Sequence, residues 1–275
     1  MNKASTELFD FSGEIAVVTG GAGVLPGAMA STLLRAGCAV ALWGRGSSHP
    51  VENAVSQLME ETGVDGSRLI GITVDTGKEA EVQRALDETV SGLGEPTILV
   101  NGVGGNKGKS DFVDIDIETF DEVVTMNLLA GLVIPLKAFA KRWGEKQMPG
   151  TVINIASMTS YVPLSGVWAY IAAKSATKAL TEGAAREFAP QGIRVNAIAP
   201  GFFIGHQNRK LLIKDDETGE LTDRGKAILN RTPFGRFGEP GDMEGTTLYL
   251  ASRKASGFVT GVTIPVDGGY LVDSI

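Results

Sequence analysis

The stretch "TGGAGVLPGAMA", residues 19–30, follows the apolar run "EIAVV" and sets the interpretation of the whole chain. A short apolar strand, a glycine-rich turn and the start of a helix are typical of a turn that holds a phosphate with backbone N–H groups. Val24 and Pro26 stand where such turns usually carry glycine. Proline is tolerated in the first turn of a helix, because its missing N–H would have no helical partner there. We therefore expect an altered turn that still binds a dinucleotide.

Composition favours a single soluble domain over residues 1–275. Hydrophobic residues make up 43% of the chain and charged residues 21%, which is ordinary for a globular protein. The formal charge of −7 argues against a general nucleic-acid surface. The single cysteine, Cys38, has no partner for an internal disulfide, which favours a reducing compartment. The start "MNKASTELFDFSG" has no apolar run after a basic end, and no window resembles a membrane span. We expect a cytoplasmic protein with no membrane or nucleic-acid partner.

Short apolar runs alternate with longer helical patterns along the chain. Such alternation predicts an α/β, Rossmann-type fold: a doubly wound, parallel, seven-stranded sheet with helices on both faces. The strands are expected at residues 15–19, 39–43, 69–74, 97–101, 151–156, 193–199 and 258–264. Helices are expected at about residues 27–36, 50–62, 78–91, 118–143, 167–189 and 240–251.

The segment at residues 202–237 interrupts this alternation. It holds no strand pattern, and its middle, "KDDETGELTDRGK" at residues 214–226, is strongly charged. A long excursion after the carboxyl end of a parallel strand lies where α/β folds bind their substrates. We interpret it as a substrate lid, with a solvated surface insertion as the alternative.

Tyr170 and Lys174, in "AYIAAKSA", carry the strongest chemical signal. Four residues apart on a helix, their side chains lie one turn apart on the same face. A nearby ammonium favours phenolate, so Lys174 is expected to lower the pKa of Tyr170 and make its phenol a usable proton donor and acceptor. Ser157 follows the expected strand "TVINIA", and its hydroxyl could hydrogen-bond a substrate carbonyl. Asn127 lies inside a helical pattern, where asparagine is mildly unfavourable.

A set of motifs occurs in the order of the short-chain dehydrogenase/reductase family, which the chain resembles from about Gly13 to Gly269. The resemblance implies that Tyr170 is the general acid/base and that Lys174 lowers its pKa and holds the nicotinamide ribose. It also implies that Ser157 orients the carbonyl and that Asn127 holds a water in a proton relay. The motifs are "TGGAGVLPG", "VNGVGG", "MNLLAG", "INIAS", "YIAAK", "IRVNAIAPG" and "VTIPVDGG".

The resemblance also implies a nicotinamide cofactor and assigns its contacts. Asp75 would contact the adenine, while Asn101 and Gly104 would line the adenosine side. The family usually has "NNAG" at residues 101–104, where this chain has "NGVG". The full set of implied cofactor residues is Gly20, Gly21, Gly23, Val24, Leu25, Arg45, Asp75, Thr76, Asn101, Gly102, Gly104, Tyr170, Lys174, Pro200, Gly201 and Phe203.

The residues after the second strand favour NADP(H) over NAD(H). NAD-specific chains place an acidic residue there, which bonds the ribose 2′-hydroxyl and repels a 2′-phosphate. This chain has Gly44 at that position, followed by Arg45, whose guanidinium suits a phosphate. The alternative is that Arg45 points to solvent and that both cofactors bind.

The stretches "APGFFIGHQNRKLL" and "LTDRGKAILNRTPFGRFGEP" resemble the D-mannonate oxidoreductase, or fructuronate reductase, branch of this family. That resemblance implies hydride transfer between nicotinamide and a ketone of a sugar acid. Gly205 is a departure, because many members of the family have threonine at this position, after the pattern PGxxx. A reductase of another polyol, keto-gluconate or keto acid is the second hypothesis, and a non-catalytic cofactor sensor the third. The candidate substrate residues are Ser157, Met158, Asn106, Lys107, Gln207, Asn208 and Arg209, with no metal site expected.

An oligomer is also expected by resemblance. The helical patterns at residues 118–143 and 167–189 carry apolar residues on more than one face. One face must pack on the sheet, so the other is available to a partner subunit. We therefore expect a homodimer or a homotetramer.

Overall fold

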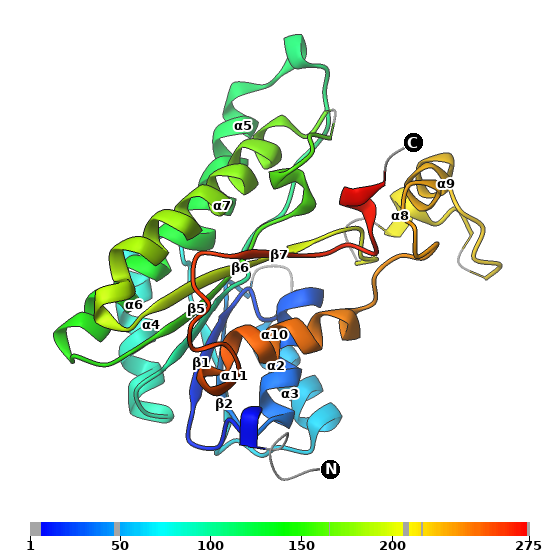
Figure 1. Cartoon of the computed structure of the whole chain (residues 1–275). Helices are drawn as coiled ribbons and strands as arrows, with labels where there is room; N and C mark the ends of the chain where they lie inside the picture. Colours follow the sequence, from blue (N-terminus) through cyan, green and yellow to red (C-terminus); the bar gives the residue numbers. More distant parts are fainter. Residues whose placement is uncertain (1–6, 47–49, 165, 206–208, 216, 274–275) are drawn as a thin grey trace.

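The computed structural model of the chain describes residues 7–46, 50–164, 166–205, 209–215 and 217–273. Seven strands form one sheet in the order β3-β2-β1-β4-β5-β6-β7, and every neighbouring pair is parallel (Figure 1). This confirms the expected fold. The strands are β1 (Ile15–Thr19), β2 (Ala39–Gly44), β3 (Leu69–Thr73), β4 (Ile98–Asn101), β5 (Thr151–Ile155), β6 (Arg194–Pro200) and β7 (Thr263–Val266).

Helices cover both faces of the sheet, because successive strand residues point to opposite sides. Val18 belongs to the apolar core under α2, α3 and α10, whereas its neighbour Val17 belongs to the core under α4, α6 and α7. The first group comprises α2 (Val24–Arg35), α3 (Val51–Thr62) and α10 (Glu244–Ala251), and the second α4 (Glu79–Gly92), α6 (Ile134–Glu145) and α7 (Trp168–Phe188).

Six strands agree with the sequence-based limits to within one residue, but the seventh was placed wrongly. Residues 258–264 were expected to be extended, whereas β7 begins only at Thr263. Gly261 has φ +80, a left-handed conformation that ends an extended run. Asn196 of β6 holds this turn with its side chain, accepting the Val262 N–H at 3.1 Å and donating to the Val259 carbonyl at 3.0 Å.

The helix expected at residues 118–143 is in fact three segments. α5 (Ile117–Val124) continues into a π-helical stretch, Thr125–Val133, and then into α6. Taken together, Ile117–Glu145 is long and apolar enough to cross a membrane by length and composition, which the sequence analysis did not anticipate. Half of its most apolar window is buried inside the domain, as in a core helix.

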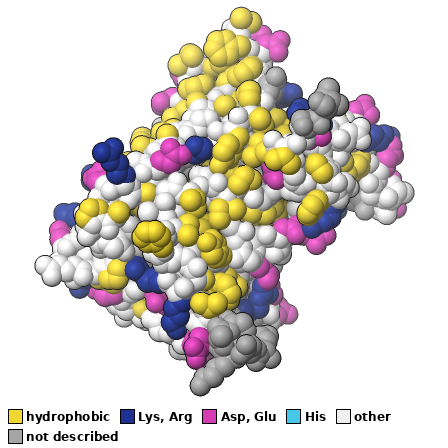
Figure 2. Space-filling model, in the orientation of Figure 1, with side chains coloured by type: hydrophobic (Ala, Val, Ile, Leu, Met, Phe, Trp, Pro, Cys, Tyr) yellow, Lys and Arg dark blue, Asp and Glu magenta, His cyan; other side chains and the backbone are white. Residues whose placement is uncertain are grey.

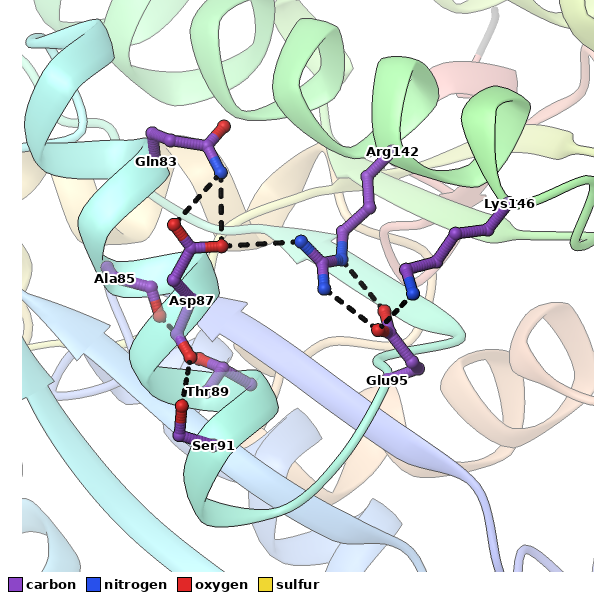
Figure 3. Close-up of polar contacts among 8 residues, drawn as sticks. All are labelled: Gln83, Ala85, Asp87, Thr89, Ser91, Glu95, Arg142 and Lys146. Carbon is purple, nitrogen blue, oxygen red and sulfur yellow. Dashed lines mark hydrogen bonds and ion pairs between the residues drawn. The ribbon is translucent and has the colours of Figure 1, made fainter.

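Ion pairs and hydrogen bonds link α6 to α4 and to the loop before β4 (Figure 3). Arg142 makes two hydrogen bonds of 2.8 Å to the Glu95 carboxylate and one of 3.3 Å to Asp87. Lys146 adds a contact of 2.9 Å to Glu95. The Arg142 guanidinium holds the pKa of Glu95 down, at about 2, with a smaller contribution from Lys146. The network therefore links α4, α6 and the loop before β4 on the side of the sheet opposite the carboxyl ends of the strands.

The segment at residues 202–237 contains no strand among its described residues, as expected. It forms two short helices, α8 (Arg209–Leu212) and α9 (Asp223–Asn230), which project from one side of the molecule (Figure 1). Leu212, Ile228 and Phe237 form a small apolar cluster of their own, separate from the two main cores. The segment is thus a structured excursion attached to the edge of the domain.

Candidate active site

The glycine-rich turn after β1 leaves room for an anion at the start of α2. Gly20 has φ +65, and a Cβ atom on it would lie 3.0 Å from the Gly102 carbonyl. A Cβ atom on Gly21 would lie 2.6 Å from the Leu42 side chain. Gly23 caps α2 without a side-chain hydrogen bond, and no acidic residue lies in the first turn. The backbone N–H groups there are uncapped by any side chain, so the turn fits the pyrophosphate of a dinucleotide.

The helix begins earlier than expected, at Val24 rather than near Gly27. Pro26 is therefore its third residue, still within the first turn where the missing N–H has no helical partner. Its ring packs on the loop after β4: a Cβ atom on Gly102 would lie 2.6 Å from Pro26 Cγ and 2.5 Å from the Thr19 carbonyl oxygen. The Thr19 carbonyl and the Pro26 ring together leave no room for a side chain at residue 102. Pro26 and Gly102, both departures from the family pattern, therefore lie against each other.

The position that would carry an acidic residue in an NAD-specific chain is closed by packing. A Cβ atom on Gly44 would lie 2.9 Å from Val51 Cγ2, and Val51 is 1% exposed. Arg45, the next residue, is exposed. The described residues at this end of β2 therefore present a guanidinium and no carboxylate.

Ser157 and Tyr170 meet at the carboxyl edge of the sheet. Ser157 follows β5, and its hydroxyl oxygen accepts the Thr159 N–H at 3.2 Å, which caps the short 3-10 turn Met158–Ser160. Tyr170 is the third residue of α7, and its phenol lies close enough to the Ser157 hydroxyl for that hydroxyl to lower the pKa of the phenol. A strand end and a helix start therefore present two hydroxyl groups to one point, as the sequence predicted.

Lys174 lies one turn further along α7 and is 4% exposed. Its ammonium donates to the Ile155 carbonyl at 2.7 Å and lies 5.7 Å from the centre of the Tyr170 ring. Lysine, tyrosine and serine are thus assembled within one small region. Because this region lies at the ends of β4 and β5, it borders the turns that fit the dinucleotide.

The pKa directions correct one expectation. Burial raises the pKa of the Tyr170 phenol, and the nearby Ser157 hydroxyl opposes this rise, whereas Lys174 was expected to lower the pKa. Burial also lowers the pKa of Lys174 itself, to about 8. Lys174 is nearly fully buried, and its ammonium is hydrogen-bonded to a main-chain carbonyl rather than to the phenol.

Asn127 fixes the loop after β4. Its amide nitrogen donates to the carbonyls of Gly105 (2.7 Å) and Val123 (2.8 Å), and its oxygen accepts the Gly105 N–H at 3.1 Å. It lies in the π-helical stretch, a feature frequent at functional sites. A Cβ atom on Gly104 would lie 2.6 Å from the Asn127 oxygen and 3.2 Å from Lys174 Nζ. The side chain is thus engaged by the backbone, and its role in holding a water stays a prediction.

A buried polar chain beneath the site was missed by the sequence analysis. Asn101 donates to Asn154 at 2.9 Å, and Asn154 donates to Thr181 at 2.9 Å. The Asn101 side-chain oxygen is buried and accepts no hydrogen bond. An uncharged amide in the middle of the apolar run "TVINIA" was the available signal, because a buried polar group needs a partner. The open acceptor at Asn101 fits a hydroxyl donor of a bound ligand.

The other implied cofactor residues lie at the same edge of the sheet. Asp75 follows β3 and accepts the Gly77 N–H at 3.0 Å, with buried Thr76 beside it. Pro200 ends β6, and a Cβ atom on Gly201 would lie 2.7 Å from Asp267 Cα. The Phe203 ring packs on Gly238, where a Cβ atom would lie 2.7 Å away, and it lines a cavity of about 370 Å³ under the lid. Leu25, in the first turn of α2, is partly buried against the core.

The candidate substrate residues divide into three groups. Met158 is buried next to Ser157, while Asn106 is exposed and donates to the Gly108 carbonyl at 2.7 Å. Lys107 is paired at the surface with Glu122, at 2.6 Å. Arg209 begins α8, and the candidates Gln207 and Asn208 lie outside the described residues. In the described part of the chain no group of three or more histidine, cysteine or acidic residues could hold a metal ion.

A family model described as Enoyl-(Acyl carrier protein) reductase matches residues 25–271. The chain belongs to the short-chain dehydrogenase/reductase family. It is an oxidoreductase that acts on alcohol or keto groups. The match covers most of the chain, so the site described above is that of a member of this family.

Similar proteins act on, or are named for, sugar acids. A 2-dehydro-3-deoxy-D-gluconate 5-dehydrogenase of Formosa agariphila is 35% identical, over 97% of this chain and 96% of its own. A Haemophilus influenza protein with the provisional name D-mannonate oxidoreductase, solved with bound NAD, is 32% identical with a TM-score of 0.86, covering 98% and 99%. An Agrobacterium tumefaciens protein with the provisional name 2-deoxy-D-gluconate 3-dehydrogenase, solved with bound NADP, is 32% identical with a TM-score of 0.83, covering 96% and 99%.

Proposed function

We propose that the protein is an NADP(H)-dependent oxidoreductase that interconverts a ketone and a secondary alcohol of a sugar acid, of the D-fructuronate/D-mannonate type. The observation that carries this proposal is the meeting of Ser157, Tyr170 and Lys174 beside two glycine turns that fit a dinucleotide. The names of the sugar-acid relatives support the substrate class.

The chain's own residues would act on the substrate oxygen. The carbonyl oxygen would lie between the hydroxyls of Ser157 and Tyr170, and Tyr170 would give its proton to the alkoxide as it forms. The bound nicotinamide would supply the hydride. Because the pKa of Lys174 is about 8, its side chain is mostly protonated at pH 7 and able to restore the proton to Tyr170. The nearby Ser157 hydroxyl partly offsets the rise that burial causes in the pKa of the Tyr170 phenol.

The residues at the end of β2 support the proposed preference for NADP(H) over NAD(H). Val51 fills the space beside Gly44, and Arg45 is available for a 2′-phosphate. A fluorescence titration with NADPH and NADH tests this directly, and tighter NADH binding would refute it. Arg45→Ala should weaken NADPH binding about tenfold and leave NADH binding unchanged, since only NADPH carries the 2′-phosphate.

Converting the preference should need two changes rather than one. Gly44→Asp alone brings its Cβ atom against Val51, so we expect it to weaken both cofactors. Gly44→Asp with Val51→Ala should restore room for the carboxylate and favour NADH. If the single variant already favours NADH, the packing argument is wrong.

Turnover assays decide among the substrate hypotheses. Purified protein would be assayed with NADP⁺ or NAD⁺ on D-mannonate and D-gluconate, and on D-mannitol as a neutral polyol of the same length. Oxidation of a sugar acid supports the proposal, whereas preference for D-mannitol favours the polyol alternative. Cofactor binding without turnover of any of these, or of a panel of keto acids, would favour the non-catalytic sensor.

We also propose that the protein is cytoplasmic and forms a homodimer or homotetramer. Leu129 and Leu180, on the π-helical stretch and on α7, are 42% and 40% exposed. Hydrophobic side chains also gather at the end of the molecule where the 3-10 turn Phe112–Asp114 leads into α5 (Figure 2). Leu129→Glu with Leu180→Glu should yield a smaller particle in light scattering. An unchanged mass would place the interface elsewhere.

A further inference from the structure

The loop after β4 carries two lysines in different electrostatic states. Lys107 is paired with Glu122, with Nζ 2.6 Å from the carboxylate oxygen. Lys109, two residues later, makes no ion pair or hydrogen bond with any described residue. The charge of Lys107 is therefore already compensated, whereas that of Lys109 is not.

The stem of Lys109 lies across Gly166, in the segment that leads into α7. A Cβ atom on Gly166 would lie 2.4 Å from Lys109 Cγ and 2.5 Å from Lys109 Cε. Gly166 also has φ +86, so both its backbone and the space above it require glycine. The hydrocarbon part of the Lys109 side chain therefore lies along the buried Gly166, while Lys109 as a whole is exposed.

Neighbouring contacts hold the two segments together. Ser110 donates its N–H to the Gly166 carbonyl at 3.2 Å, and Trp168 donates to the Ser110 carbonyl at 3.0 Å. The Phe112 ring meets the Trp168 ring edge-on, 5.3 Å between centres. Lys109 therefore sits on a fixed wall rather than on a freely moving loop.

The loop after β4 approaches Lys174 at one end and the segment before Tyr170 at the other. At one end, a Cβ atom on Gly104 would lie 3.2 Å from Lys174 Nζ. At the other end, Lys109 covers Gly166, which precedes Tyr170 by four residues in the sequence. A substrate whose ketone lies at Tyr170 and whose carboxylate lies several carbons away would extend along this wall.

We propose that Lys109 binds the carboxylate of the substrate and so sets the preference for sugar acids over neutral sugars. This inference rests on the proposed function and names the residue for its substrate class. The chain has a formal charge of −7, so its overall field repels an anionic substrate. An ammonium that no carboxylate neutralises would attract the substrate carboxylate locally against this field. Lys107, Asn106 and the lid residues were the sequence-based candidates, and the pairing of Lys107 makes it the poorer choice.

The test compares Lys109→Met with Lys107→Met. Methionine keeps a flexible apolar stem and removes the charge in both positions. For Lys109→Met we expect the KM for D-mannonate to rise about tenfold or more, with kcat and NADPH affinity within about twofold, because a charged hydrogen bond to the carboxylate is lost. Lys107→Met should change KM less than about threefold. Lys109→Arg, which keeps the charge, should restore most of the affinity.

A binding arm separates this inference from the proposed function. D-mannonate and D-mannitol are titrated calorimetrically into Tyr170→Phe protein loaded with NADP⁺, with and without Lys109→Met. We expect D-mannonate binding to weaken, and to lose most of its dependence on salt, while D-mannitol binding is unchanged. Equal D-mannonate affinity in the two proteins, or no binding to either, overturns the role of Lys109. Binding without turnover in the parent enzyme overturns the proposed function alone.

Discussion

The proposed catalytic cluster of Ser157, Tyr170 and Lys174 and the segment at residues 202–237, interpreted as a lid, both follow the carboxyl ends of strands, yet their contacts differ in kind. Lys174 is nearly fully buried and bonded to the last residue of β5, and Ser157 caps the turn that follows. The lid segment instead makes these polar contacts within itself: the Thr222 hydroxyl donates to the carbonyls of Leu211 and Leu212, and Lys214 pairs with Glu220. Proton transfer needs groups held in fixed positions, whereas a segment that opens and closes over a substrate, as we propose for residues 202–237, can be stabilised separately from the domain.

Tyr170→Phe tests the proposed catalytic cluster most directly, and we expect it to have the largest effect. Removing the phenolic hydroxyl deletes the proton donor, so kcat should fall by about 10³-fold or more, while the NADPH dissociation constant stays within about threefold. Steady-state kinetics and a fluorescence titration measure the two quantities. Tyr161→Phe is the matched control, because its hydroxyl donates to the Thr263 carbonyl outside the cluster. Substantial turnover by Tyr170→Phe would contradict the assignment.

Burial of Lys174 should also make the free energy of unfolding depend on pH. Its pKa is about 8 in the folded protein against 10.5 for an ordinary lysine, so the unfolded chain binds more protons between these values. Folded stability is therefore reduced below pH 8, and this penalty disappears as the pH rises to 10.5. The difference of about 2.5 pH units corresponds to roughly 3 kcal/mol.

Denaturant unfolding of the wild type and Lys174→Met, from pH 7 to 10.5, measures this penalty. The wild type should gain roughly 3 kcal/mol relative to the variant across that range. Lys178→Met provides the opposite case, since the Glu182 hydrogen bond raises the pKa of Lys178. A constant difference between wild type and Lys174→Met would show that Lys174 is charged throughout.

The sequence predicted those features that depend on residue type and spacing along the chain. Apolar runs gave six strands to within one residue, and the spacing of Ser157, Tyr170 and Lys174 predicted their convergence. Contacts between distant residues carried no such signal. The Pro26–Gly102 contact, the chain from Asn101 to Thr181, and the position of Lys109 each join segments whose separation is set only by the folded sheet. The predicted direction of the Tyr170 pKa shift was wrong for the same reason, because the burial that raises this pKa depends on the whole fold.

A smaller effect is expected at the cofactor turns, which share the rigidity of the catalytic cluster. Gly102→Ala places a methyl group against Pro26 and the Thr19 carbonyl, so the two turns must separate and NADPH affinity should fall about tenfold. Pro26→Gly in the same protein removes the ring and should recover part of the loss. Gly183→Ala, on α7 with open space around it, controls for glycine replacement in general. Additive losses in the double variant would show that the two residues act independently.

The lid should respond least in global stability. Ile228 belongs to the lid's own apolar cluster, whereas Ile153, in β5, belongs to the main core. Ile153→Ala should lower the free energy of unfolding by about 3 kcal/mol, as large-to-small core changes do. Ile228→Ala should lower it by less than about 1 kcal/mol, because the lid can open without unfolding the sheet. Amide exchange should nevertheless quicken across α8 and α9, and KM should rise with little change in kcat. An equal loss of global stability in both variants would show that the lid segment unfolds together with the domain and does not open independently of it.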